Sequence, residues 1–254
     1  MSVLDRPYQL SEHLYVVFAE FPHVDSGNVY LVTGERPTLI DCGSDNAVAS
    51  IVSNLAQLGL SPSDIGQVVA THADYDHIQG FHGLQHLNPE LCLRIHRADL
   101  PVVREADAYR TASYVYGRPY IQLDDRCLLP FDPGDIVPVG DTSLEVSSTP
   151  GHTEGSVCLL GKIDARNVLF AGDTVGGAMR SLEGASIEAW FEAARAWSDS
   201  LRRLSERDFD WVLNGHEPPQ GLPITRARFD RMVRQFGIMM NPWFSRGERE
   251  PVVS

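Results

Sequence analysis

The stretch Thr71–His77, THADYDH, carries two histidines and two aspartates at positions 72, 74, 76 and 77. The apolar run that precedes it, Gln67–Ala70, is typical of a short buried strand. The four polar side chains are therefore expected on the turn that leaves this strand, where several of them can face one cleft. Imidazole nitrogens and carboxylate oxygens are both ligands of zinc and other first-row metals. The stretch therefore predicts a metal site that includes His72, Asp74, Asp76 and His77.

Three later places repeat this arrangement of a predicted strand followed by a loop with a metal-type ligand. They are STPGHTEGS with His152, NVLFAGDTV with Asp173, and WVLNGHEPP with His216. A dinuclear site needs ligands from several loops that meet at one edge of the fold. The four loops together therefore predict a site for two divalent metal ions.

Composition limits the classes of partner. The chain has 254 residues and a formal net charge of −13, and Lys162 is its only lysine. Such a chain lacks the basic surface that holds nucleic acid or an anionic membrane, so we expect a small-molecule substrate. The sequence leaves the oligomeric state open, a homodimer included. The N-terminus resembles no signal peptide, and the four cysteines are scattered, which favours reduced thiols and a cytoplasmic enzyme.

The order of predicted elements favours an α/β fold. Short apolar strands alternate with helices along residues 1–254, and the last helices are expected at 187–204 and 224–239. Two similar halves follow one another without a linker between them. The simplest packing is a single domain, a sandwich in which two sheets lie face to face with helices outside.

Residues 97–140 are expected to form helix and irregular loop, as a lid or substrate-binding segment. Five prolines interrupt the segment, and long loops in compact domains are often functional. Its tyrosines are candidates for a substrate wall, with core packing as the alternative. Arg180 is a candidate partner for a substrate carboxylate, with a solvated side chain as the alternative. The tyrosines concerned are Tyr109, Tyr114, Tyr116 and Tyr120.

The motif THADYDH resembles the H-x-H-x-D-H motif of the metallo-β-lactamase superfamily. His152 in PGHTEGS, Asp173 in FAGDT and His216 in NGHE look like the remaining ligands of that family. The resemblance spans about residues 26–216 and implies the αββα four-layer sandwich. The spacing of 21 residues from His152 to Asp173, and of 43 from there to His216, is most similar to lactonases and related small hydrolases.

The resemblance also implies roles for these residues. A water or hydroxide between the two metals would be the nucleophile. Asp76 would orient this water or move its proton, and Asp173 would bridge the metals, so both are expected to be catalytic. One metal would take His72, Asp74 and His152, and the other Asp76, His77 and His216.

Asp74 departs from the family motif, which has histidine at this position. The site would then have three carboxylates, and an oxygen-rich site shifts preference from zinc, the first expectation, toward iron or manganese. Hydrolysis of a small ester, lactone or thioester is the leading interpretation. A di-iron oxygen or redox protein, a phosphoester hydrolase and a non-catalytic sensor of the same fold remain as alternatives.

Some polar residues outside this set are expected to be structural. Asp41 in LIDCG is predicted to orient a neighbouring loop through hydrogen bonds. His82 and His86 are expected at the surface or in packing, and Asp99 is expected to cap a helix or to be solvated.

Overall fold

The structure is a computed structural model that describes residues 2–21, 25–177 and 186–240. A seven-stranded sheet has the strand order β2-β3-β5-β6-β7-β8-β9, and a six-stranded sheet has the order β10 to β15. The first sheet comprises β2 (Tyr8–Ser11), β3 (Leu14–Phe18), β5 (Val29–Val32), β6 (Thr38–Ile40), β7 (Gln67–Val69), β8 (Leu93–His96) and β9 (Leu128–Phe131). The second comprises β10 (Ile136–Val139), β11 (Thr142–Ser148), β12 (Val157–Ile163), β13 (Arg166–Gly172), β14 (Trp211–Asn214) and β15 (Ile224–Thr225). A separate pair is formed by β1 (Ser2–Val3) and β4 (Glu20–Phe21).

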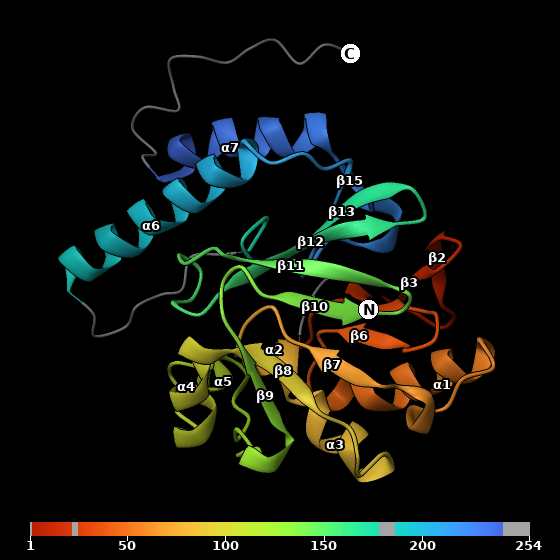
Figure 1. Cartoon of the computed structure of the whole chain (residues 1–254). Coiled ribbons are helices and arrows are strands. Elements are labelled where there is room, and N and C mark those ends of the chain that lie inside the picture. The colour runs from red at the N-terminus through yellow and green to blue at the C-terminus, as the bar shows by residue number, and fades with distance from the viewer. Residues whose placement is uncertain (1, 22–24, 178–185, 241–254) are drawn as a thin grey trace.

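Helices cover the outer face of each sheet, so that the molecule has four layers (Figure 1). The first sheet is flanked by the helices of the N-terminal half, and the second sheet by the last two helices. This arrangement confirms the predicted αββα sandwich. The helices are α1 (Val48–Gln57), α2 (Tyr75–Ile78), α3 (Gly80–Leu87), α4 (Leu100–Glu105), α5 (Ser113–Tyr116), α6 (Ile187–Ser205) and α7 (Arg226–Met240).

Strand β5 shows why a central strand of the first sheet is apolar at every position. All four of its residues are buried. Tyr30 and Val32 belong to the core cluster that includes the second sheet, whereas Val29 and Leu31 belong to the cluster under α1 and α3. Successive side chains of a strand point to opposite faces, so a sheet covered on both sides needs apolar residues at every position.

The parallel pairing of strands determines at which edge of the sheets the connecting loops lie. β6, β7 and β8 pair in parallel in the first sheet, and β13 pairs in parallel with β14 in the second. Parallel neighbours end at the same edge of a sheet, where ligand-binding loops commonly lie. The segments after β7, β13 and β14 carry all the predicted metal ligands except His152, which lies between β11 and β12, so this edge positions the site.

The expectation of helix and irregular loop for residues 97–140 is wrong for its last part. Residues 128–131 form β9, which pairs with β8, and residues 136–139 form β10, which pairs with β11. Pro130 and Pro138 lie within these strands. Both strands are at the edge of their sheet, where a residue without an N–H donor is tolerated, so proline does not exclude a strand here.

The final helix also begins later than expected, because Ile224–Thr225 pair with β14 before α7 starts at Arg226. Among the described residues, no helix combines the length and the apolar composition needed to cross a bilayer.

Candidate metal centre

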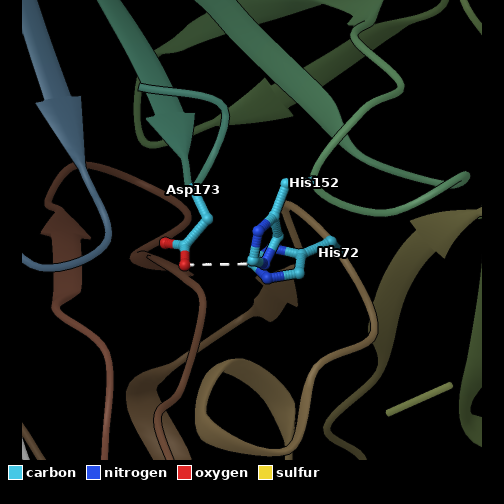
Figure 2. Close-up of side chains that lie close together, drawn as sticks. All are labelled: His72, His152 and Asp173. Carbon is cyan, nitrogen blue, oxygen red and sulfur yellow. Dashed lines mark ion pairs between the residues drawn. The ribbon is translucent and has the colours of Figure 1, made fainter. Parts of the chain in front are cut away.

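Side chains from four loops meet at one edge of the sandwich, between the two sheets. Figure 2 shows three of them, His72, His152 and Asp173, with their polar atoms turned toward one another. All of the residues predicted as ligands come from turns or short helices that follow strands. His72 and Asp74 follow β7, Asp76 and His77 lie on α2, His152 lies between β11 and β12, Asp173 follows β13, and His216 follows β14.

The first group of ligand atoms belongs to His72, His152 and Asp173, which offer atoms within 4.8 Å of one another. Oδ2 of Asp74 lies 3.1 Å from Nε2 of His152 and 3.6 Å from Nε2 of His72. Oδ2 of Asp173 lies 3.6 Å from Nε2 of His152. Asp74 therefore lies against the same imidazoles as the carboxylate of Asp173.

The second group belongs to Asp76, His77 and His216, whose ligand atoms also lie within 4.8 Å of one another. Oδ2 of Asp76 is 3.4 Å from Nε2 of His216 and 3.7 Å from Nε2 of His77. The two oxygens of Asp173 reach this group as well, 3.0 Å from Nε2 of His216 and 3.3 Å from Nε2 of His77. Asp173 is thus the residue that the two groups share.

These separations fit ligands of a metal ion. Two ligand atoms on a tetrahedral ion at bond lengths of about 2.1 Å are about 3.4 Å apart, and the nitrogen–oxygen distances within the cluster run from 3.0 to 3.7 Å. Nε2 of His72, Nε2 of His77 and Oδ1 of Asp173 are buried and have no hydrogen-bond partner among the described residues. Buried polar atoms are costly without a partner, so these atoms suit a bound cation.

The charges of the cluster favour a cation for the same reason. Burial would raise the pKa of Asp173, but His216 and His77 hold that pKa well below its usual value. Burial would lower the pKa of His77, but the carboxylates of Asp76, Asp173 and Asp41 raise it well above its usual value. Burial lowers the pKa of His72 well below its usual value, and His77 and His152 lower it further. The buried carboxylates thus favour a positive charge beside them, which a bound cation would supply.

Asp41 orients two of the histidines, which confirms its predicted structural role. Its buried carboxylate accepts hydrogen bonds from the backbone N–H of Thr71 at 2.7 Å and from Oγ1 of Thr71 at 2.8 Å. Nδ1 of His77 lies 2.9 Å from the same carboxylate, and Nδ1 of His72 lies 2.9 Å from Oγ1 of Thr71. A carboxylate only accepts, and the Thr71 hydroxyl donates to it, so both Nδ1 atoms are donors. Both Nε2 atoms therefore present a lone pair to the cluster when the rings are neutral.

Two glycines let the backbone approach the ligands, a feature that the pattern of metal-type residues in the sequence does not reveal. A Cβ at Gly215 would lie 2.1 Å from Oδ1 of Asp173 and 2.7 Å from Cε1 of His77. A Cβ at Gly27 would lie 2.9 Å from Cε1 of His77. Any side chain at these positions would displace a ligand, so the glycine before His216 in NGHE is the sequence signal for this close approach.

The tyrosines proposed as a substrate wall lie in three different environments. Tyr116 hydrogen-bonds to Asp76 and stacks on Tyr75 with ring centroids 5.3 Å apart. Tyr109 and Tyr114 stack on each other at 5.2 Å. Tyr120 is buried in the core cluster under the first sheet and therefore packs. Arg180 lies outside the described residues.

Asp99 lies at the N-cap position of α4, as expected, but its side chain makes no capping hydrogen bond there, and it is 3% exposed rather than solvated. Burial raises the pKa of its carboxyl to about 7, although the nearby guanidinium of Arg110 and a hydrogen bond with the backbone of Ala73 oppose this. Ala73 lies between two of the metal-type ligands. Asp99 therefore ties α4 to the loop that carries them.

Comparison with known proteins gives a consistent picture. A family model described as "Metallo-beta-lactamase superfamily" matches residues 23–216. Acyl-coenzyme A thioesterase MBLAC2 of Gallus gallus is 30% identical over 58% of this chain and 57% of its own length, so the chain spans little more than half of that relative. Metallo-beta-lactamase domain-containing protein 1 of Xenopus laevis is 27% identical over 76% of this chain and 71% of its own. Hydroxyacylglutathione hydrolase of Maricaulis maris is 28% identical over 71% and 60%.

Solved structures show the same fold. MEM-A1, a subclass B3 metallo-beta-lactamase isolated from a soil metagenome library, has a TM-score of 0.72 at 19% identity, covering 93% of this chain and 94% of that one. A B3 metallo-beta-lactamase with an active-site glutamic acid has a TM-score of 0.72 at 22% identity, covering 96% and 92%. At these identities the similarity extends to the fold and not to the substrate.

Proposed function

Because this chain belongs to the metallo-beta-lactamase superfamily, we propose that it is a hydrolase that uses two divalent cations to cleave a small ester, lactone or thioester. The observation that carries the proposal is the pair of ligand groups that share Asp173. A shared carboxylate holds two cations close together, which suits the attack of a water on a carbonyl carbon. Zinc is the first expectation for these cations.

His72, Asp74 and His152 would hold one cation, and Asp76, His77 and His216 the other, with Asp173 between them. When bound, the cations supply Lewis acidity and lower the pKa of a water to near neutrality. Asp74 adds a third carboxylate to the ligand set, so iron or manganese are the alternatives to zinc. The burial of most of these side chains keeps bulk water away and strengthens their interaction with charge.

Asp76 is the residue of this set best suited to accept a proton from the attacking water or to orient that water. Its carboxylate lies 3.4 Å from the His216 imidazole and hydrogen-bonds to Tyr116. A carboxylate held from two sides has a fixed orientation, and it can accept the proton of an attacking water or orient that water. The phenol of Tyr116 would keep the oxygen that it contacts from rotating away.

The names of two relatives support a thioester among the candidate substrates. One is an acyl-coenzyme A thioesterase and the other a hydroxyacylglutathione hydrolase, and both names describe the removal of an acyl group from a sulfur-containing carrier. The net charge of −13 supports a small molecule rather than a nucleic acid as substrate.

The test is metal analysis followed by a substrate panel on the metal-loaded protein. We expect about two cations per chain and turnover of a thioester, lactone or ester. The His152→Ala and Asp173→Ala variants should each lose bound metal and fall to background turnover, while His82→Ala, an exposed histidine outside the cluster, should match the parent protein. Full activity in either cluster variant would overturn the site.

The panel also separates the alternatives. Turnover of bis-p-nitrophenyl phosphate, with none of the acyl compounds, would indicate a phosphoester hydrolase. Two iron ions with oxygen consumption would indicate a redox protein. A fully loaded protein inert to all of these would indicate a sensor.

A further inference from the structure

A cavity of about 490 Å³ lies beside the ligand cluster, between the loop after β7, helix α4 and helix α6. It reaches the cluster at His152, which lines it, and at Ala73, which lies between the ligands His72 and Asp74. A group bound in this cavity would therefore contact a metal ligand directly. Part of the wall is made of small apolar side chains, namely Ala73, Val102, Pro150, Ala189, Ala193 and Ala196.

We propose that this cavity binds an uncharged apolar acyl chain of the substrate, with the scissile carbonyl at the ligand cluster. The inference rests on the proposed hydrolase function and adds the class of acyl group to it. The continuity of the cavity with His152 is the first reason, because a chain in the cavity leaves its carbonyl end beside the cluster.

Helix α6 makes one wall of the cavity, and its sequence leaves the space open. Ala189, Ala193 and Ala196 follow one another at spacings of four and three residues, which places them on one face of the helix. Their methyl groups present apolar surface without filling the cavity. Each methylene of an acyl chain buried there should increase kcat/KM about fourfold, the fold change that corresponds to about 0.8 kcal/mol.

The wall formed by helix α6 is held in place by packing and hydrogen bonding of Trp197. The Trp197 ring on α6 packs edge-on against the His152 ring, with centroids 5.8 Å apart, and its indole N–H donates to the backbone carbonyl of Thr174 at 2.8 Å. Gly151 has φ +148°, and a Cβ there would lie 2.2 Å from Cβ of Trp197. The helix thus lies close against the His152 loop at Trp197, which holds this wall of the cavity in place.

The charged groups around the cavity favour a neutral occupant. Three acidic residues line it, against a single arginine among the described lining residues. That arginine, Arg110, already lies 3.5 Å from Glu154 and 3.8 Å from Glu105. A carboxylate at the end of the chain would meet net negative charge and is therefore disfavoured. The acidic residues that line the cavity are Asp99, Glu154 and Glu192.

The experiment compares straight-chain N-acetylcysteamine thioesters from acetyl to decanoyl on the metal-loaded protein and on two variants. Ala193→Phe adds bulk inside the cavity, and Ser198→Phe adds the same bulk on the exposed face of the same helix. In the parent protein kcat/KM should rise about fourfold per methylene until the cavity is full. Ala193→Phe should lose at least tenfold on octanoyl and less than twofold on acetyl, and Ser198→Phe should match the parent.

Adipoyl thioester should be at least tenfold poorer than its neutral counterpart hexanoyl thioester. A flat dependence on chain length, or an equal loss on all chains in a folded and metal-loaded Ala193→Phe, would overturn the inference while leaving the hydrolase intact.

Binding of S-alkyl thioethers of N-acetylcysteamine, measured by calorimetry, separates the two proposals. If no thioester, lactone or ester is turned over, the proposed function fails. Thioether affinity that increases with chain length and is lost in Ala193→Phe would still support the cavity, and affinity independent of chain length would refute it.

Discussion

Replacing Asp41 by asparagine should weaken metal binding although Asp41 is not one of the ligands. The parent carboxylate accepts from two donors of Thr71 and from Nδ1 of His77, at 2.7, 2.8 and 2.9 Å. Asparagine keeps one accepting oxygen and replaces the other by a donating NH₂ group. An NH₂ group that faces Nδ1 of His77 favours the ring tautomer with the proton on Nε2, the atom that points into the cluster. Loss of such an orienting partner typically costs 10–100-fold in metal affinity, or about 1.4–2.7 kcal/mol.

The substitution should also destabilise the metal-free protein. It weakens two buried hydrogen bonds to a charged group, and each donor left without its partner costs roughly 1–3 kcal/mol. The assays are a competition titration against a chromogenic zinc chelator and urea unfolding in the presence of a chelator. The nitrogen chemical shifts of His77 report its tautomer directly. Asp199→Asn, which removes an equally charged but half-exposed carboxylate on α6, should leave all three measurements unchanged. Metal affinity within threefold of the parent in a folded Asp41→Asn protein would refute the reasoning.

Three further changes test other parts of the structure. Asp74→His should raise the zinc content relative to iron and manganese after growth in mixed metals, and an unchanged ratio would mean that this carboxylate does not set metal preference. Tyr116→Phe keeps the ring but removes the hydroxyl that hydrogen-bonds to Asp76, so kcat should fall about tenfold with unchanged metal content; an unaltered kcat would exclude this role. The hydrogen bond with Asp164 raises the pKa of His13, so this contact stabilises the fold fully below about pH 6.5 and its contribution is lost as the pH rises through the raised pKa. His13→Gln should therefore lower Tm more at pH 6 than at pH 8.5, and a pH-independent difference would contradict this.

The sequence was most informative where the chemistry is local. Three of the predicted ligands closely follow an apolar run, so the position of His72 after β7, of Asp173 after β13 and of His216 after β14 could be inferred without knowledge of the fold. The sandwich followed from the alternation of strands and helices. Asp41 could be assigned a structural role, but its contacts with Thr71 and His77 join residues 30 or more positions apart, and the sequence pattern does not specify such contacts.

The environments of the residues proposed to lie near the substrate were harder to predict from the sequence, because they depend on how residues 97–127 pack. Tyr116 and Tyr120 belong to one tyrosine-rich stretch, yet the first reaches Asp76 and the second lies in the core. Asp99 lies at the N-cap position of α4, as its residue type suggested, but its side chain is buried and hydrogen-bonds to the backbone of Ala73 instead of capping the helix. Pro130 suggested a loop and lies in an edge strand. In each case the tertiary neighbours, and not the local propensity, determine the environment of the side chain.

The distribution of the ligands along the chain has a consequence for biosynthesis. The group formed by His72, His152 and Asp173 is complete once residue 173 has left the ribosome, whereas the second group lacks His216 until 43 residues later. Domains emerge from the N-terminus at about 5–20 residues per second, so this interval lasts seconds. In the proposed dinuclear site, the ligands of one cation would therefore all be synthesised before the ligand set of the other is complete.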